Sequence, residues 1–271
     1  EPENEESPEE IAQRELEEKK EKLKGKKVKN GDLVRVDIFG KTIEKNNKDS
    51  IVFMASNQED AKKLINYNPQ EAGRYFPELA IVGKDGFLME SLADKVEGME
   101  FFEDKIVELE AEDAFGKRVP GNLEWVKSRR FQQVMGKPPQ AGAEYNDKKG
   151  RKGIVRKVGS GKALVDFNHP LAGKKVEYRL RVVDLIEEED EKIRAFITRR
   201  LPGPIGKEFD IVHNEENETL DIGISQMVAY QLSQQQGGMF LKMGIARDLQ
   251  EHLDYGTIRF LKKKKKYEPP E

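Results

Sequence analysis

The stretch that decides the fold is "LVDFNHPLAGKKVEYRLRVVDLI", residues 164–186. It places a short uncharged turn, Asn168 to Gly173, between two strand-like runs, in a chain whose other loops are dense in charge. The simplest interpretation of Asn-His-Pro is a tight turn that joins two strands. Whether the turn does more depends on the rest of the chain.

Composition limits what kind of protein this is. The chain has 271 residues, which is long enough for two or three domains that each bury a core. With 37% charged residues, a mean hydropathy of -0.78 and no apolar run near 18 residues, we expect a cytoplasmic protein with no membrane span and no signal peptide. Cysteine is absent, which excludes disulfides, thiolate catalysis and cysteine-ligated metal sites.

Metal, cofactor and nucleic-acid functions are not favoured. The three histidines, His169, His213 and His252, stand far apart, so we expect no metal site. Neither standard spacing of a glycine-rich phosphate loop is present, and we expect no cofactor. The net charge is -3, and the lysine run at 262–266 is typical of a solvated tail, so contact with nucleic acid or the ribosome is not the expected function.

Apolar periodicity predicts strands and helices in a mixed order. Period two predicts strands at 32–40, 49–56, 104–110 and 174–187. Strong helix formers predict a solvated helix over 9–27 and a short one over 59–65. Within 82–99, a helix with one buried face is predicted by the helical spacing of Leu88, Met89, Leu92 and Val96.

Turn signals divide the chain into domains. Residues 118–165 carry their own turn signals and their own set of apolar residues. The strand expected after them completes the set of strands that begins before residue 118. Residues 118–165 are therefore predicted to be a domain inserted into another domain. We expect a charged N-terminal segment at 1–30, a main domain at 31–117 plus 166–188, an inserted domain at 118–165, and a C-terminal α+β domain at 189–271. In the last, helices flank the Gly237-Gly238 pair and strands are expected near 206–214, 217–224 and 256–262.

Three blocks together resemble one protein family. They are "VDIFG" with Val52-Phe53, then "FLMESLADKVEGM" with "EDAFG", and above all "VDFNHPLAGKKVEYRLRVVDL". The sequence is similar to the FKBP-type peptidyl-prolyl cis-trans isomerases, specifically the SlyD-like group and its long archaeal members, over Gly31 to Glu188. The resemblance implies an α+β fold: an antiparallel half-barrel around a short helix, with an inserted flap domain. It also implies that the Asn-His-Pro turn bends over one end of an apolar substrate groove.

The resemblance assigns the groove residue by residue. The catalytic wall would be formed by Phe53, Leu92, Phe115 and Tyr178, and further substrate contacts by Ile38, Leu88, Met89, His169 and Leu171. Many relatives carry a tryptophan where Leu92 stands and polar residues where Ile38, Met54 and Phe115 stand. Each lost hydrogen bond is worth about 1 kcal/mol, so we expect modest turnover and weak binding of macrolide inhibitors. Core packing is the alternative role for each of these residues.

The inserted segment suggests a second activity. In the SlyD-like group this domain binds unfolded chains, and the apolar residues here that would do so are Trp125, Phe131 and Met135. A small domain also needs a core, so we expect only two or three residues of its apolar set to be exposed. The expected partners are unfolded or proline-containing polypeptides, with a homodimer through the C-terminal domain as a further interpretation.

Two functions of different classes follow. The first is a peptidyl-prolyl isomerase and folding chaperone, favoured by the intact "FNHPLAG" loop. The second is a non-catalytic chaperone or binding module on the same scaffold, favoured by the apolar residues at 38, 54 and 115. We prefer the first.

Overall fold

The computed structural model describes residues 8–44, 49–201, 209–214, 218–234 and 238–262. The lysines at 263–266, the turn at 215–217 and Gly237 lie outside these residues. Helices and strands alternate along the chain and the sheets contain antiparallel pairs, so the fold is α+β, as expected. Within the described residues no helix is both long enough and apolar enough to span a bilayer.

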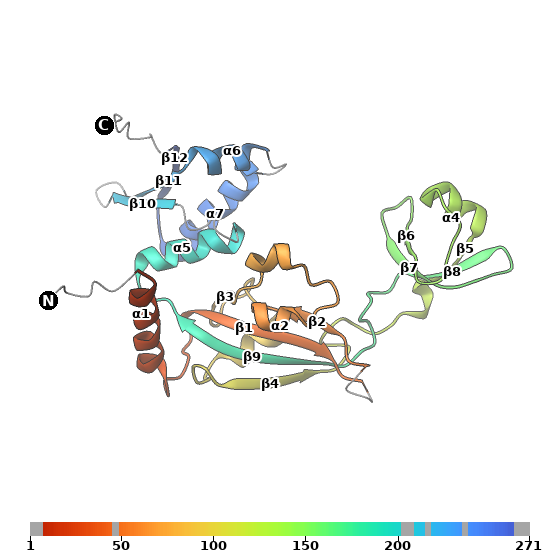
Figure 1. Ribbon diagram of the computed structural model, residues 1–271, viewed down its shortest axis with the longest axis horizontal. Helices are drawn as coiled ribbons and strands as arrows, with labels where there is room; N and C mark the ends of the chain where they lie inside the picture. The colour runs from red at the N-terminus through yellow and green to blue at the C-terminus, as the bar shows by residue number, and fades with distance from the viewer. Residues whose placement is uncertain (1–7, 45–48, 202–208, 215–217, 235–237, 263–271) are drawn as a thin grey trace. The chain divides into compact units, whose positions relative to one another are not determined.

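A five-stranded sheet contains the predicted strands. Its order is β2-β1-β9-β4, and β3 also pairs with β1. The predicted strands are confirmed as β1 (Leu33–Thr42), β2 (Val52–Ala55), β4 (Asp104–Leu109) and β9 (Val176–Leu185). β1, β9 and β4 run side by side in Figure 1. β3 (Glu78–Ile81), antiparallel to the first half of β1, was not predicted, because its short apolar run follows Pro77 and has no period-two pattern.

The first two helices of this region end earlier than predicted, and the third starts later. α1 covers Pro8–Leu23 and α2 only Gln58–Ala61, followed by a 3-10 turn at Pro69–Arg74. α3 covers Glu90–Val96, so the helix begins after Leu88 and Met89 rather than including them. Gly83 and Gly86 adopt positive φ angles of 80° and 85°, which produces a loop before the helix. Met89 is the extended residue that precedes the first helical turn.

The chain divides into two compact units. The first contains residues 1–40, 52–107 and 178–271, and the second contains 41–51 and 108–177. The boundary falls inside strands β1, β4 and β9. The domain boundaries predicted at 118–165 and 189–271 remain predictions.

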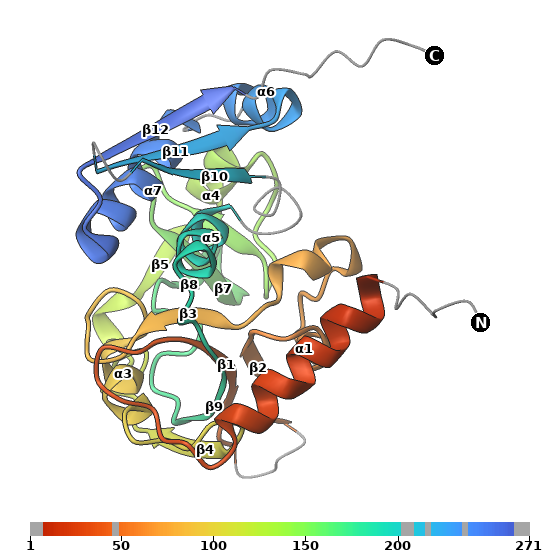
Figure 2. The same ribbon diagram turned by 90° about the vertical axis from the view of Figure 1, so that its left-hand side faces the viewer.

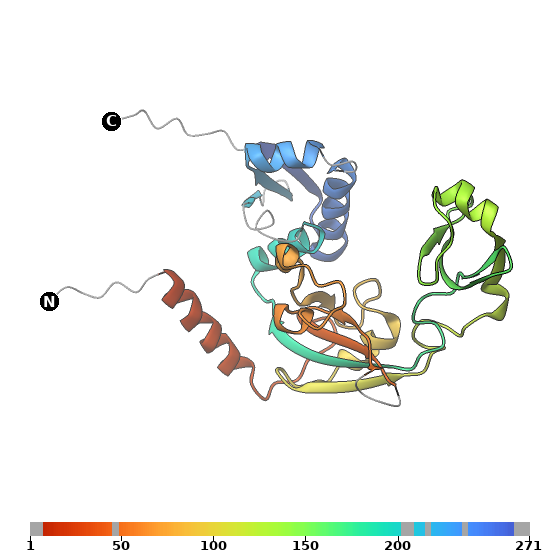
Figure 3. The same ribbon diagram turned by 45° about the vertical axis from the view of Figure 1, so that its right-hand side comes forward.

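The second unit contains a small sheet with its own core. The sheet order is β5-β8-β7-β6, with β5 at Leu123–Lys127, β6 at Glu144–Asn146, β7 at Lys152–Gly159 and β8 at Lys162–Asp166. A 3-10 turn at Pro120–Asn122 precedes it, and α4 (Ser128–Met135) crosses one end of it, as Figure 3 shows. The buried core consists of Val126, Phe131, Tyr145, Val155, Ala163 and Val165.

The C-terminal elements share a core with the first strands. They are α5 (Glu189–Arg200), β10 (Phe209–Asn214), β11 (Thr219–Ile224), α6 (Gln226–Gln234), α7 (Gly238–Leu253) and β12 (Thr257–Lys262). β11 lies between antiparallel β10 and parallel β12, as Figure 2 shows. Ile193 and Phe196 of α5 belong to one buried cluster with Leu33, Leu79 and Ile81 of the five-stranded sheet. The C-terminal elements are therefore packed against β1 and β3.

Candidate functional site

Phe53 on β2 and Tyr178 on β9 form an aromatic pair across strand β1. Their ring centroids are 5.6 Å apart and the rings are inclined at 85°, the edge-to-face geometry that ring quadrupoles favour. Gly40 on β1, the strand between them, makes room for both rings. A Cβ at position 40 would lie 2.8 Å from Cε2 of Phe53 and 3.0 Å from Cε1 of Tyr178. The pair therefore requires glycine at this position.

The hydroxyl of Tyr178 is directed at Met89. Tyr178 is fully buried, and its hydroxyl donates a hydrogen bond to Sδ of Met89 at 3.5 Å. Burial raises the pKa of Tyr178, so the phenol is a donor at neutral pH. Met89 is 37% exposed. This contact places an apolar, water-facing side chain against the hydroxyl of the buried Tyr178, whose ring partner Phe53 is half-buried.

Ile38 and Leu92, two further predicted groove residues, are buried. Each is 1% exposed, so each belongs to the core and not to a solvent-facing wall. Ile38 is fixed at the backbone, where its N–H donates to Oγ of Ser56 at 2.6 Å and its carbonyl accepts from the N–H of Ser56 at 3.0 Å. Leu92 lies in the first turn of α3, and its N–H donates to the carbonyl of Met89 at 2.9 Å.

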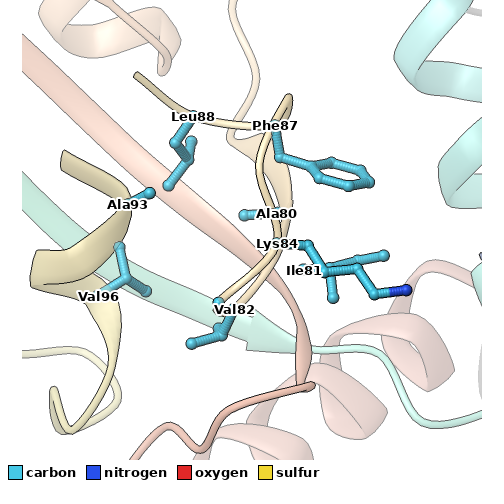
Figure 4. A pocket seen from close by; sticks show the side chains of 9 residues that line it. Ala80, Ile81, Val82, Lys84, Phe87, Leu88, Ala93 and Val96 are labelled. Atoms are coloured by element: carbon cyan, nitrogen blue, oxygen red, sulfur yellow. The ribbon is translucent and has the colours of Figure 1, made fainter. Parts of the chain in front are cut away.

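Two hollows near the predicted residues do not suit a proline ring. One has a volume of about 10 Å³ and lies between the β3–α3 loop and α3, with Leu88, Ala93 and Val96 on its wall (Figure 4). The other, of about 530 Å³ in the second unit, is lined by backbone and charged side chains that include Glu110, Asp113, Lys117 and Arg118. The first is too small and the second is too polar to hold a proline ring.

A buried polar cluster fixes β2 and α2 beside the aromatic pair. Ser56 Oγ donates to Oδ1 of Asp37 at 2.6 Å. Asn57 Nδ2 donates to Oδ2 of Asp37 at 2.8 Å and to Oδ2 of Asp60 at 2.9 Å. Asn57 also caps α2 by accepting from the N–H of Asp60 at 2.8 Å. Sequence reasoning missed this cluster.

Arg179 supplies a positive charge to both buried carboxylates, and Lys63 supplies a second one to Asp60. Arg179 donates to Asp60 and lies 3.8 Å from Oδ2 of Asp37. Burial alone would raise the pKa of Asp60, but hydrogen bonds from Lys63, Asn57 and Arg179 outweigh it and lower the pKa to about 2. The Asp60 carboxylate is therefore ionised at neutral pH, and its ion pair locks β9 to the start of α2. The adjacent residue on β9 is Tyr178.

The Asn-His-Pro turn carries a second aromatic pair, in the second unit. The rings of Phe115 and His169 stack with centroids 4.7 Å apart and an interplanar angle of 1°. Nδ1 of the exposed His169 accepts from the N–H of Leu171 at 3.2 Å, and Leu171 is only 8% exposed. The turn thus presents the imidazole face to Phe115 and buries the leucine.

Side-chain hydrogen bonds tie this turn to the segment that follows Phe115. Asn168 accepts from the N–H of Val119 at 2.9 Å through Oδ1 and donates to the Val119 carbonyl at 3.1 Å through Nδ2. Gly173, with a φ of 77°, donates its N–H to the carbonyl of Gly116 at 2.8 Å. The opening turn therefore does more than join two strands, because it fixes the Phe115 segment in place.

Asp166 anchors the base of the same turn. Its Oδ1 accepts from Nδ2 of Asn168 at 2.8 Å, Oδ2 accepts from Nε of Arg156 at 3.0 Å, and Arg118 forms an ion pair with it. Burial would raise the pKa of Asp166, but these hydrogen bonds and the charge of Arg118 lower it. The carboxylate is ionised, and it orients the amide of Asn168.

The three residues assigned to the inserted segment lie in different environments. Trp125 on β5 is 54% exposed. Phe131 is fully buried and stacks on Tyr145 with centroids 4.9 Å apart, so its place is in the core and not on a binding surface. Met135 is half-buried against the same core. Val126, the neighbour of Trp125, faces inward because successive strand residues point to opposite sides.

The structure brings the predicted residues together in two groups. The first unit contains Ile38, Phe53, Leu88, Met89, Leu92 and Tyr178. The second unit contains Phe115, His169 and Leu171. Among the described residues no set of three or more His, Asp or Glu side chains is placed to hold a metal ion.

Comparison with known proteins gives several relatives and no matching family model. The short-type peptidyl-prolyl cis-trans isomerase of Methanocaldococcus jannaschii is 32% identical over 171 residues, which cover 98% of that protein and 60% of this chain. The FKBP-type 16 kDa peptidyl-prolyl cis-trans isomerase of Escherichia coli is 29% identical over 105 residues, which cover 69% of that protein and 37% of this chain. A probable FKBP-type 16 kDa isomerase of Pseudomonas fluorescens is 26% identical over 103 residues.

Proposed function

The chain belongs to the FKBP-type peptidyl-prolyl cis-trans isomerases, and from that premise we propose that it isomerises X–Pro bonds of polypeptides at the apolar surface of Phe53, Met89 and Tyr178. The observation that carries this placement is the edge-to-face pair of Phe53 and Tyr178, with the exposed Met89 against the hydroxyl of Tyr178. The assignment of Phe115, His169 and Leu171 to a substrate groove stays a prediction.

An apolar surface is sufficient for this chemistry. Isomerisation breaks no covalent bond, and its barrier of about 20 kcal/mol is the amide resonance lost when the X–Pro bond twists. The twisted imide is less dipolar than the planar one, so an apolar wall that excludes water favours the transition state over the ground state. Phe53 and Met89 would form that wall, and the buried Tyr178 would hold Met89 in position. Neither a nucleophile nor a metal ion is required.

The isomerase site is tested by the turnover of a short X–Pro peptide. Phe53→Ala removes one ring of the pair and should lower kcat/KM by about tenfold, equivalent to about 1.4 kcal/mol of transition-state stabilisation. Ile106→Ala is the control, because Ile106 is 54% exposed on β4, at the opposite end of the strand order from β2. Equal turnover in the two folded variants would refute the placement.

We further propose that residues 118–165 bind unfolded polypeptides through the surface around Trp125. The supporting observation is that a tryptophan, the largest apolar side chain, is 54% exposed on β5, although isolated apolar residues do occur on protein surfaces. Trp125→Ala should slow catalysed refolding of a proline-limited protein client and leave turnover of a short peptide unchanged. Val158→Ala is the control, since Val158 is 41% exposed in the same sheet. Equal losses on both substrates would contradict a separate client surface.

Self-association through the C-terminal helices is a second candidate role. It is favoured by four large exposed apolar side chains, Tyr230 (65%), Met239 (76%), Phe240 (77%) and Met243 (57%). A homodimer would bury such side chains. Light scattering of the full chain at high micromolar concentration tests this proposal: a dimer that Met239→Glu converts to a monomer supports it, and a wild-type monomer refutes it.

A further inference from the structure

The β3–α3 loop connects the proposed substrate surface with the C-terminal elements. It runs from Gly83 to Leu88 and ends at Met89, which precedes the first turn of α3. Both the N–H of Leu92 and the N–H of Ala93 donate to the carbonyl of Met89 at 2.9 Å. Any displacement of this loop would therefore move Met89 and the first turn of α3 together.

Phe87 is the loop residue whose side chain contacts the C-terminal elements. The guanidinium of Arg199 on α5 lies 4.4 Å from the centroid of the Phe87 ring, within the range of a cation–π contact. The ring also contacts Phe196 of α5 at 6.2 Å and His252 of α7 at 5.1 Å, centroid to centroid. Three side chains from beyond residue 189 thus surround one loop residue.

Arg199 also holds the backbone of the loop. Its Nη2 donates to the carbonyl of Gly86 at 2.6 Å. A single arginine therefore fixes both the main chain at Gly86 and the ring of Phe87. The guanidinium is suited to this double role, because it can donate in its plane while its face lies over an aromatic ring.

The other side of the loop contacts the proposed substrate surface. In Figure 4 Leu88 projects toward Ala93 of α3, whereas Phe87 projects away from α3. The next residue, Met89, accepts the hydrogen bond from Tyr178. Three consecutive residues thus join the C-terminal elements, α3 and the aromatic pair.

The contact of Phe87 with His252 favours a fixed loop. His252 stacks on Phe196 with an interplanar angle of 16° and centroids 5.4 Å apart, and its buried Nδ1 has no hydrogen-bond partner among the described residues. Burial lowers the pKa of His252, so the imidazole is neutral at neutral pH and packs as an aromatic ring. Phe87 therefore lies between an aromatic surface and the arginine.

We propose that Arg199 and Phe87 are positioning residues for the isomerase site. The C-terminal elements hold the β3–α3 loop through these two residues and thereby set the position of Met89 over Tyr178. Affinity for the prolyl substrate then depends on a helix that does not itself contact substrate. This inference rests on the proposed function of the Phe53, Met89 and Tyr178 surface.

The test compares two arginines of the same helix in the full chain. Arg199→Ala removes the hydrogen bond to the Gly86 carbonyl and the cation–π contact with Phe87. Arg194→Ala is the matched control, because Arg194 also donates to a backbone carbonyl, that of Phe209 at 2.9 Å. Among the described residues Arg194 makes no hydrogen bond or ring contact with the β3–α3 loop. Arg199→Lys keeps a cation near Phe87 but loses the planar guanidinium group, which can stack on the ring and donate in its plane at the same time.

Two measurements are made on each variant: the KM and kcat for an X–Pro peptide, and the ¹³C-methyl NMR signal of Met89, assigned with Met89→Leu. Arg199→Ala should raise KM by about two- to fivefold, the size expected for one lost cation–π contact, with kcat retained. The Met89 methyl signal should shift or broaden. Arg199→Lys should restore part of both effects, and Arg194→Ala should change neither.

The two measurements separate this inference from the proposed function. If Arg199→Ala leaves the Met89 signal and KM as in Arg194→Ala, the positioning role is refuted. If the wild-type chain shows no turnover, the proposed function fails, while the Met89 signal still reports whether Arg199 holds the loop. Should Arg199→Ala not fold, Phe87→Leu, which keeps an apolar side chain but removes the ring face, carries the same expectation.

Discussion

Two aromatic pairs that contain predicted groove residues, Phe53–Tyr178 and Phe115–His169, are held by different forces. The first spans two strands that flank β1, and its geometry depends on the space left by Gly40. The second stacks on a turn whose shape depends on side-chain hydrogen bonds from Asn168. Packing thus fixes one pair and polar contacts fix the other. A change of volume should break the first, and the loss of one amide should loosen the second.

The largest effect is expected from filling the space between the rings of the first pair. Gly40→Ala places a Cβ within 3.0 Å of both rings. Overpacking of this kind should lower the free energy of unfolding by about 3 kcal/mol and displace Phe53 or Tyr178. Turnover of an X–Pro peptide should fall more than tenfold. Denaturant unfolding and the peptide assay measure the two effects.

Gly159→Ala on β7 is the control, since its Cβ would meet nothing within 4 Å. If Gly40→Ala matches this control in stability and turnover, packing at position 40 does not fix the first pair.

The next effect concerns the acid stability of the polar cluster beside the first pair. The pKa of Asp60 is lowered to about 2 from an ordinary value of 3.8. Because the folded pKa lies below the unfolded one, the carboxylate stabilises the fold above about pH 4, and this contribution is lost as the pH falls toward 2. Asp60→Asn should therefore cost roughly 2 kcal/mol at pH 7 and little at pH 2.

The free energy of unfolding of Asp60→Asn, measured from pH 7 to pH 2, checks this pH dependence. Glu59→Gln is the control, because Glu59 is an exposed neighbour of Asp60. A cost for Asp60→Asn that is the same at every pH would mean that ionisation of Asp60 does not link β9 to α2.

The smallest effect is expected at the second pair. Asn168→Ala removes the two hydrogen bonds to the backbone of Val119, the one to Asp166 and the one from Asn122. Because Asn168 is only half-buried, water can replace part of this bonding, and we expect a loss of about 1 kcal/mol. Crystallography or NMR of the variant should find the His169 ring released from Phe115.

Asn146→Ala, on the exposed side of β6, provides the comparison. An unchanged ring stack in Asn168→Ala would show that the second pair is also fixed by packing, and the distinction between the pairs would be lost.

Much of the fold was predictable because its signals are local. Alternation over 32–40 and 174–187 predicted β1 and β9, and the turn at Asn168 to Gly173 was evident from composition. The start of α3 was not predictable from the sequence. Leu88 and Met89 fit helical spacing, but they lie in the loop that Gly83 and Gly86 form before the helix. The roles of Trp125 and Phe131 separate only when it is known which face of β5 and which face of α4 pack into the core.

The parts of the site that sequence reasoning missed depend on long-range contacts. Asp37, Asn57, Asp60 and Arg179 meet across more than a hundred residues, and a charged side chain on a strand ordinarily predicts a solvated face. The cation–π contact between Arg199 and Phe87 likewise joins residues 112 positions apart (199 − 87). Period and motif describe neighbours along the chain, so they carry no signal for such pairs.

The most direct test of the central claim uses one NMR sample of the wild-type chain with a short X–Pro peptide. Exchange spectroscopy measures the rate of cis–trans interconversion of the peptide, and the ¹³C-methyl spectrum follows Met89 and the exposed Met239 at the same time. We predict that catalytic amounts of the protein accelerate interconversion, and that peptide shifts the Met89 signal but not that of Met239. An unchanged interconversion rate, or acceleration without any response at Met89, would contradict the assignment of prolyl isomerisation to the surface of Phe53, Met89 and Tyr178.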